Sequence, residues 1–157
     1  PLRAFAKSSA AEPGKVVDRG AVAFLPLDVT CYQSVARSGG EFTQEAAVSL
    51  EKRFGDPGLA DKAVVVVQHP PPFGYNPVRH WIDGLRGHMR LMDLLVRFTR
   101  VQVLHGHMHR AIDRIIDLGK SRIFGAPAIV EDEESAPRVR LYDVRDGAIE
   151  SAGILTG

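Results

Sequence analysis

The segment from Val101 to Arg110 constrains this chain most, because it is an apolar run that ends in three histidines around one glycine. The apolar part alternates as a β-strand does, and Gly106 interrupts that pattern where the histidines begin. Side chains two residues apart on an extended chain share a face, so we expect His107 and His109 to converge. Neutral imidazoles bind Zn, Mn, Fe or Co. Two histidines cannot close a metal site, so a site here needs further ligands from elsewhere in the fold.

A second strand pattern also ends in a histidine. The run from Ala63 to Val67 is almost entirely β-branched, which is typical of a central strand covered on both faces. Gln68-His69 and three prolines follow, and because prolines cannot continue a ladder, the chain must leave the sheet with His69 at its edge. An amphipathic helix predicted from Met89 to Phe98 connects this strand to the one that begins at Val101. A parallel βαβ unit places both strand ends at one edge, so we expect His69 near the other histidines.

The rest of the chain completes an α/β pattern. Residues 1–20 have no periodicity and are expected to form a loop or mobile lead-in. A buried strand is predicted from Ala21 to Val29, and a helix begins after Thr43 as its N-cap. Four short strands joined as antiparallel hairpins follow the histidines, with turn signals at Gly119-Lys120 and Asp146-Gly147. These strands are predicted over Ala111 to Leu118, Arg122 to Val130, Val139 to Val144 and Ala148 to Ala152.

Two stretches have no regular pattern. We expect Gly74 to Gly87 to be irregular, and its larger polar and aromatic side chains either line a cleft or cap a surface loop. These side chains are Tyr75, Arg79, His80 and Trp81. The acidic run Glu131-Asp132-Glu133-Glu134 is interpreted as a solvated loop, because no flanking residues resemble a calcium loop.

Composition limits the classes of function. The 157 residues fit one globular domain, and a formal net charge of +1 argues against a nucleic-acid partner, because such proteins usually carry a concentrated basic excess. No apolar stretch approaches the roughly 20 residues needed to cross a bilayer, so we expect no membrane partner. The single cysteine, Cys31, rules out an internal disulfide and favours a cytoplasmic location.

The order of these pieces resembles the C-terminal half of a calcineurin-like metallophosphoesterase. Gln68-His69-Pro70-Pro71-Pro72 is similar to the His-His-Pro-Pro segment of that family, and Gly106-His107-Met108-His109 matches its Gly-His-x-His segment. The Leu27-Asp28 strand and the closing hairpins also resemble the family's layout. The resemblance implies an α/β fold that is part of a four-layer α/β/β/α sandwich. Residues 21–157 would then be the C-terminal portion of the metallophosphoesterase domain.

The resemblance also implies a chemistry. In that family two divalent metal ions, here Mn, Fe, Zn or Co, hold a hydroxide that attacks the phosphorus of a phosphomonoester or phosphodiester. His69, His107 and His109 would be the metal ligands. Aligning Pro71-Pro72 with the family's prolines selects His69 as a ligand, and the alternative alignment selects Gln68. His105 and Arg110 flank the motif and are expected to bind the substrate, with packing for His105 and solvent exposure for Arg110 as the alternatives.

The family's first half has no counterpart in this sequence, because no Asp-x-His, bridging Gly-Asp or Gly-Asn-His segment occurs in the required order. We therefore expect the transition-state histidine and the bridging aspartate to come from a missing N-terminal half or a partner chain, and the chain alone to be inactive. One alternative is a non-catalytic binding or scaffolding module of the same fold. Another is a metal-storing or metal-sensing protein that uses only His105, His107 and His109, in which replacing His69 has no effect on metal uptake.

Overall fold

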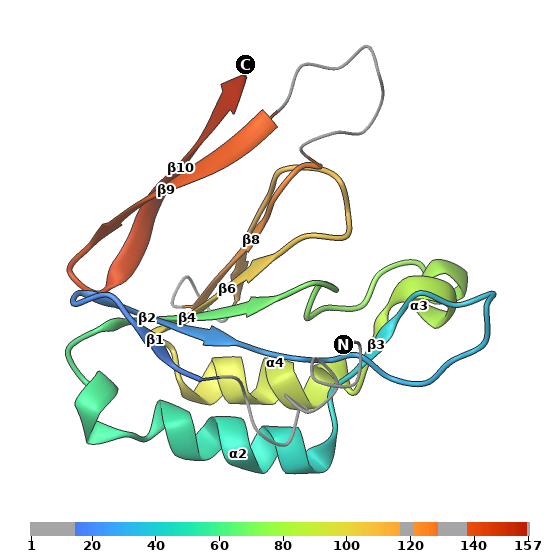
Figure 1. The fold of residues 1–157 in the computed structure, drawn as a ribbon, viewed down its shortest axis with the longest axis horizontal. Helices are drawn as coiled ribbons and strands as arrows, with labels where there is room; N and C mark the ends of the chain where they lie inside the picture. The colour runs from blue at the N-terminus through green and yellow to red at the C-terminus, as the bar shows by residue number, and fades with distance from the viewer. Residues whose placement is uncertain (1–14, 117–120, 129–137, 157) are drawn as a thin grey trace.

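The computed structural model describes residues 15–116, 121–128 and 138–156, and it is a mixed α/β structure with a mostly parallel central sheet (Figure 1). In the central sheet, neighbouring inner strands run parallel, and the outer strands β1 and β7 pair antiparallel to β2 and β8. In spatial order the strands are β1 (Val17–Asp18), β2 (Val22–Pro26), β4 (Ala63–Gln68), β6 (Val101–His105), β8 (Ser121–Gly125) and β7 (Ile112–Ile116).

The predicted βαβ unit is confirmed. Strand β4 pairs with β6 in parallel, and the register places Gln68 opposite His105, so the two strands end at the same level. Val64, Val65 and Val66 are all fully buried, as expected for a central strand with both faces covered. The chain leaves both strands side by side, and the amide N of Gly106 donates a hydrogen bond to the carbonyl O of His69 at 3.1 Å.

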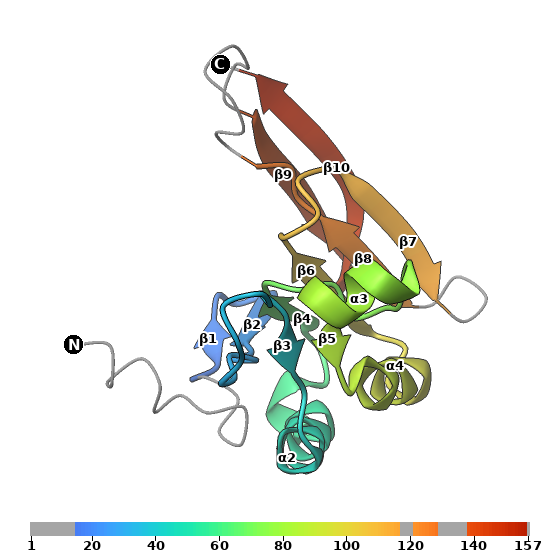
Figure 2. The ribbon, with the colours of Figure 1, turned by 90° about the vertical axis from the view of Figure 1, so that its right-hand side faces the viewer.

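The two faces of the sheet are covered by different layers. The helices α2 (Gln44–Phe54) and α4 (His88–Arg97) lie on one face, and the hairpin of β9 (Arg138–Arg145) and β10 (Ala148–Thr156) lies on the other (Figures 1 and 2). Alternate residues of β4 face these layers, because Val64 and Val66 belong to the helix-side core and Val65 to the hairpin-side core.

Local signals explain the helices. Thr43 caps α2 as predicted, because its hydroxyl accepts a hydrogen bond from the amide of Ala46. Helix α4 buries three leucines on one stripe and carries polar residues on the other side, which is the amphipathic pattern read from the sequence. These leucines are Leu91, Leu94 and Leu95.

The segment from Gly74 to Gly87 is not wholly irregular, which corrects the sequence-based expectation. It contains helix α3 (Pro77–Asp83) and the short strand β5 (Leu85–Arg86), which pairs with β3 (Gly40–Glu41). The side chain of Asn76 accepts hydrogen bonds from the first amides of α3, and Pro77 occupies the first helical position. A short one-turn helix, η1 (Pro57–Leu59), follows α2.

The expected series of antiparallel hairpins is also only partly correct. β7 and β8 form an antiparallel pair, but β8 lies between β6 and β7 and runs parallel to β6. The reason is burial: β8 is buried along most of its length and suits an inner position, whereas β7 is largely exposed and suits an edge. Gly119-Lys120 and the acidic run 131–134 lie outside the described residues.

The last hairpin forms as predicted at Asp146-Gly147. Both residues have positive φ, +47° and +75°, as a tight two-residue hairpin turn requires. The strands are longer than expected, since β10 extends to Thr156. At the other end of the chain, Val17–Asp18 form β1 within a stretch expected to be loop.

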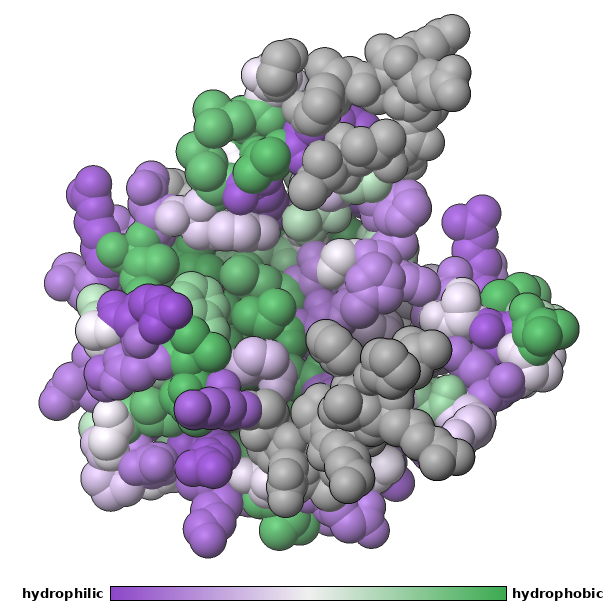
Figure 3. All heavy atoms as spheres, in the orientation of Figure 1, coloured by the Kyte–Doolittle hydropathy of each residue, from purple (hydrophilic) through white to green (hydrophobic). Residues whose placement is uncertain are grey.

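Apolar surface remains visible around the central sheet. In the space-filling view, hydrophobic side chains gather in a hollow between the hairpin and the helical layer (Figure 3). Val22 and Phe24 of β2 are among the partly buried residues that pack against the hairpin-side core. Within the described ranges, the structure has no helix with the length and apolar character needed to cross a membrane.

We predict that Leu94→Ala destabilises the fold by about 2–5 kcal/mol, because it empties a buried position between α4 and the sheet. Val96→Ala on the exposed side of the same helix is the matched control, and its effect should stay within about 0.5 kcal/mol. Urea unfolding followed by circular dichroism measures both. Equal losses in the two variants would contradict the placement of α4.

Candidate functional site

The ends of β4 and β6 bring two of the predicted ligands together. The ring centroids of His69 and His107 are 5.1 Å apart, and the two rings meet edge to face at 88°. Gly106 lies close to this pair, because a Cβ at Gly106 would lie 3.2 Å from Nδ1 of His69 and the ring would have to move slightly. The expectation that His69 lies near the histidine motif is therefore confirmed by the geometry.

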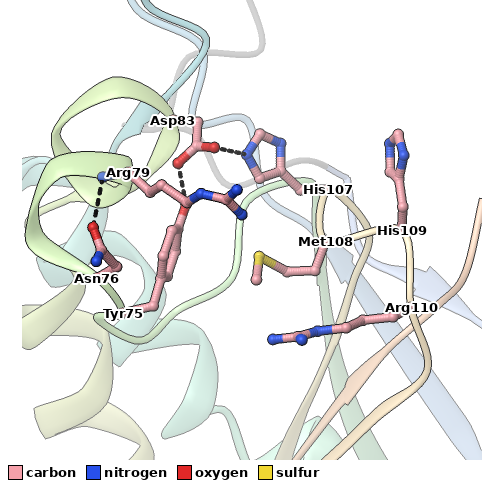
Figure 4. A pocket seen from close by; sticks show the side chains of 8 residues that line it. All are labelled: Tyr75, Asn76, Arg79, Asp83, His107, Met108, His109 and Arg110. Atoms are coloured by element: carbon pink, nitrogen blue, oxygen red, sulfur yellow. Dashed lines mark hydrogen bonds and ion pairs between the residues drawn. The ribbon is translucent and has the colours of Figure 1, made fainter.

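The loop that carries His107 and His109 differs from the extended segment that we expected. Both residues have positive φ, +66° and +51°, and β6 already ends at His105. The amide of Met108 donates to the carbonyl of Gly106 at 2.7 Å, which closes a tight turn. Figure 4 shows both imidazoles on the same side of this loop, so the backbone turn rather than strand alternation directs them.

This backbone conformation has an energetic cost. A residue with a side chain in the left-handed region is strained by about 1–3 kcal/mol, and such residues concentrate at functional sites. Of the described residues other than glycine, only His107, His109 and Asp146 have positive φ, and Asp146 is explained by its hairpin turn. The positive φ of His107 belongs to the tight turn that the Met108 amide closes, whereas His109 lies outside that turn.

His105 does not take the place expected of a substrate-binding residue. Its side chain is buried, with the residue only 3% exposed, and its ring packs edge to face against Phe73. Nδ1 lies 2.8 Å from the carbonyl O of Gly106, and because a carbonyl only accepts, Nδ1 must carry the proton. Burial lowers the pKa of His105 to about 4, with further lowering from nearby His107 and Arg140. His105 therefore packs in the core as a neutral imidazole.

The same observation weighs against a site built from His105, His107 and His109 alone. The Nδ1 of His105 is engaged, and its Nε2 is buried beside Gly125, where a Cβ would lie 3.0 Å away. An ion cannot reach that nitrogen without moving β8. His69, in contrast, adjoins His107 directly.

Gln68 and His69 also have clearly different environments. Gln68 is buried at 6% exposure, and its Nε2 donates to the carbonyl of Pro70 at 2.7 Å. Within the described part of the chain, its Oε1 is buried without a hydrogen-bond partner. His69 is exposed beside His107, so the geometry favours His69 over Gln68 as a ligand.

A pocket of about 400 Å³ opens beside the two loop histidines. Helix α3 and the residues just before it form one wall, and the histidine loop forms the other (Figure 4). Sequence reasoning noted some of these side chains but did not place them at the site, because their segment lacks an apolar period. The lining residues are Tyr75, Asn76, Arg79, Asp83, His107, Met108, His109 and Arg110.

The pocket has charges of both signs. Arg79 and Arg110 approach it from the two walls, and Asp83 at the end of α3 faces His107, with 3.8 Å between Oδ2 and Nε2. Asp83 also accepts a hydrogen bond from the hydroxyl of Tyr75. Arg110 lines this pocket and is exposed, which agrees with the alternative of solvent exposure, and its expected contact with a substrate stays a prediction.

His69 suits metal binding in its protonation state. Partial burial lowers the pKa of His69, and the charges of His107 and His109 lower it further. A neutral imidazole presents a lone pair, which is the form that binds divalent ions. Across residues 15–116, 121–128 and 138–156, however, no three His, Cys, Asp or Glu side chains already form a metal-binding group. Two adjacent imidazoles fit an ion, and the exposed ring of His109 would have to turn toward them.

Comparison of the chain with protein-family models and with curated proteins found no match. The family resemblance therefore depends on the two histidine segments and on the geometry described above.

We predict that His105 makes the free energy of unfolding depend on pH. The folded pKa near 4 lies below the ordinary value of 6.5, so the unfolded chain binds this proton first as pH falls. The associated stability is complete above pH 6.5 and is lost as pH falls toward 4, by about 3 kcal/mol in total. The variant His105→Asn retains a donor for the carbonyl of Gly106 but does not titrate in this range. Its free energy of unfolding should therefore lack this decrease at low pH. Urea unfolding at pH 7 and pH 4.5 with a chelator present measures it, and parallel pH profiles of both proteins would contradict it.

Proposed function

We propose that this chain contributes to the metal-dependent hydrolysis of a phosphomonoester or phosphodiester, as a calcineurin-like metallophosphoesterase does. The observation that carries the proposal is the contact between His69 and His107, whose rings meet at 5.1 Å from the ends of adjacent parallel strands. The charge of His109 acts on His69, which indicates that the third imidazole is also near.

The layering supports the proposal. Helices cover one face of the central sheet and a two-stranded hairpin covers the other. We infer that these layers are part of a four-layer α/β/β/α sandwich, in which the C-terminal portion extends over residues 21–157. The hydrophobic hollow beside the hairpin is consistent with coverage by further polypeptide (Figure 3).

Each wall of the pocket has a role in this proposal. His69, His107 and His109 would hold the divalent ions, which are Mn, Fe, Zn or Co. When bound, such ions supply Lewis acidity and lower the pKa of water. Arg110 from the loop and Arg79 from α3 would bind the anionic oxygens of a small phosphate ester, because a guanidinium matches the geometry of phosphate.

Further donors would come from outside this chain, either from an N-terminal half or from a partner chain. A second hollow of about 300 Å³, which His69 lines together with Cys31, Gly40 and Pro70, offers room for them. We place the protein in the cytoplasm, since a single cysteine suits a reducing compartment.

The test is metal binding by the 157-residue chain and by single variants. Titration calorimetry with Zn²⁺ or Mn²⁺ should give at least tenfold weaker binding in His69→Ala and in His107→Ala, because losing a ligand should cost no less than the ~10–100-fold cost of losing an outer partner. His88→Gln is the matched control, since His88 lies outside the pocket and contacts the carbonyl of Leu85. Affinity in this control should change little.

A second test measures the rate of phosphate-ester hydrolysis. The substrates are 4-nitrophenyl phosphate and bis(4-nitrophenyl) phosphate, and the enzyme is the metal-loaded chain together with any polypeptide that completes the site. Measurable turnover by the unaltered protein that is unchanged in His107→Ala would contradict the proposal. If the unaltered chain binds no divalent ion, the alternative of a non-catalytic binding or scaffolding module with the same fold is favoured.

A further inference from the structure

Among the residues that the structure describes, Asp83 is the one carboxylate that lines the pocket, and its two oxygens have different surroundings. Oδ1 accepts a hydrogen bond from the hydroxyl of Tyr75, whereas Oδ2 faces Nε2 of His107 at 3.8 Å (Figure 4). The side chain of Asp83 is 31% exposed and that of His107 is 12% exposed, so the pair is partly shielded from water. Neither the strand ends nor the histidine motif accounts for this carboxylate.

The carboxylate is held in place from two directions. Asp83 is the last residue of α3, and the start of that helix is fixed by the Asn76 cap. The ring of Tyr75 packs edge to face on His80, with 5.3 Å between centroids. Burial raises the pKa of Tyr75, and the hydrogen bond to Asp83 raises it further, so the hydroxyl remains protonated and acts as the donor.

The position of Asp83 can determine which nitrogen of the His107 imidazole carries the proton. An imidazole that binds an ion through one nitrogen carries its proton on the other, and a carboxylate near that second nitrogen fixes both the proton and the ring. Nε2 of His107 faces Asp83, which leaves Nδ1 on the side where His109 lies (Figure 4). The distance of 3.8 Å is roughly 0.6 Å beyond a hydrogen bond, so a small movement of the ring closes it.

We propose that Asp83, fixed by Tyr75, is a positioning residue that keeps the proton of His107 on Nε2 and presents Nδ1 to a divalent metal ion. This inference rests on the proposed function and extends it, because it assigns a role to α3, which the histidine segments do not include. Loss of such an outer partner typically weakens metal binding about 10–100-fold.

Asp83→Asn is a direct test because it should move the proton of His107 from Nε2 to Nδ1. The Tyr75 hydroxyl would continue to bind the amide oxygen, which turns the NH₂ group toward His107. That group donates to Nε2 and leaves the proton on Nδ1, where it competes with a metal ion. Tyr75→Phe keeps the carboxylate but removes the bond that fixes it, so its effect should be smaller. The double variant Tyr75→Phe with Asp83→Asn lets the amide rotate and should recover part of the loss.

Two measurements on the 157-residue chain decide the matter. Calorimetric titration with Zn²⁺ should show about 10–100-fold weaker binding in Asp83→Asn. Nitrogen-15 NMR of the imidazoles without metal, assigned with His107→Gln, should show the proton on Nε2 in the unaltered protein and on Nδ1 in Asp83→Asn. Asp93→Asn on the exposed side of α4 and Tyr142→Phe beside Phe124 are the matched controls, and both should behave as the unaltered protein does.

The outcomes separate this inference from the proposed function. If Zn²⁺ binds and neither affinity nor proton position changes in Asp83→Asn, the positioning role is wrong and the proposed function stands. If the unaltered chain binds no Zn²⁺, the proposed function fails, and the NMR comparison alone then tests the role of Asp83. In that case the positioning role is wrong if the His107 proton is on the same nitrogen in the unaltered protein and in Asp83→Asn. If Asp83→Asn does not fold, unchanged affinity and proton position in Tyr75→Phe overturn it as well.

Discussion

The parallel pairing of β4 with β6 is the interaction on which the rest of the site depends. Its register sets Gln68 opposite His105, so the chain leaves both strands at one level and the next residues meet across a hydrogen bond from Gly106 to His69. A shift of one residue would turn every side chain of a strand to the opposite face. Val64 and Val66 of β4 face the helices and Val65 faces the hairpin, so this strand is buried from both sides.

Two separate elements converge on His107 at the end of that sheet. The strand pair leads into His69, and α3 supplies Asp83, whose Oδ1 accepts a hydrogen bond from Tyr75 just before the helix. The tight turn after Gly106 holds the histidine loop with positive φ at His107, a conformation that is tolerated only where the surroundings impose it. The positive φ of His107, the lowered pKa of His69 and the carboxylate of Asp83 support the proposal that imidazole nitrogens are presented to a cation.

Part of this arrangement could be predicted from sequence, and the physical reasons are local. A run of β-branched residues that ends in proline predicts a central strand and places His69 at its end. The route of β8 could not be predicted, because its position between β6 and β7 depends on burial from both faces. Asp83 was missed because α3 has no apolar stripe, although Asn76-Pro77 is a recognisable helix start. The loop that directs His107 and His109 has positive φ at both residues, which a strand pattern does not predict, so strand alternation gave the right neighbours for the wrong reason.

The most direct test of the central claim is the position of a bound ion. Crystals of the chain soaked in Zn²⁺ can be measured at the zinc absorption edge, where an anomalous difference map locates the metal without reference to the protein atoms. The account predicts a peak about 2.0–2.1 Å from a nitrogen of both His69 and His107, with Nδ1 as the nitrogen of His107. A peak elsewhere on the chain, or one that contacts neither imidazole, would contradict it.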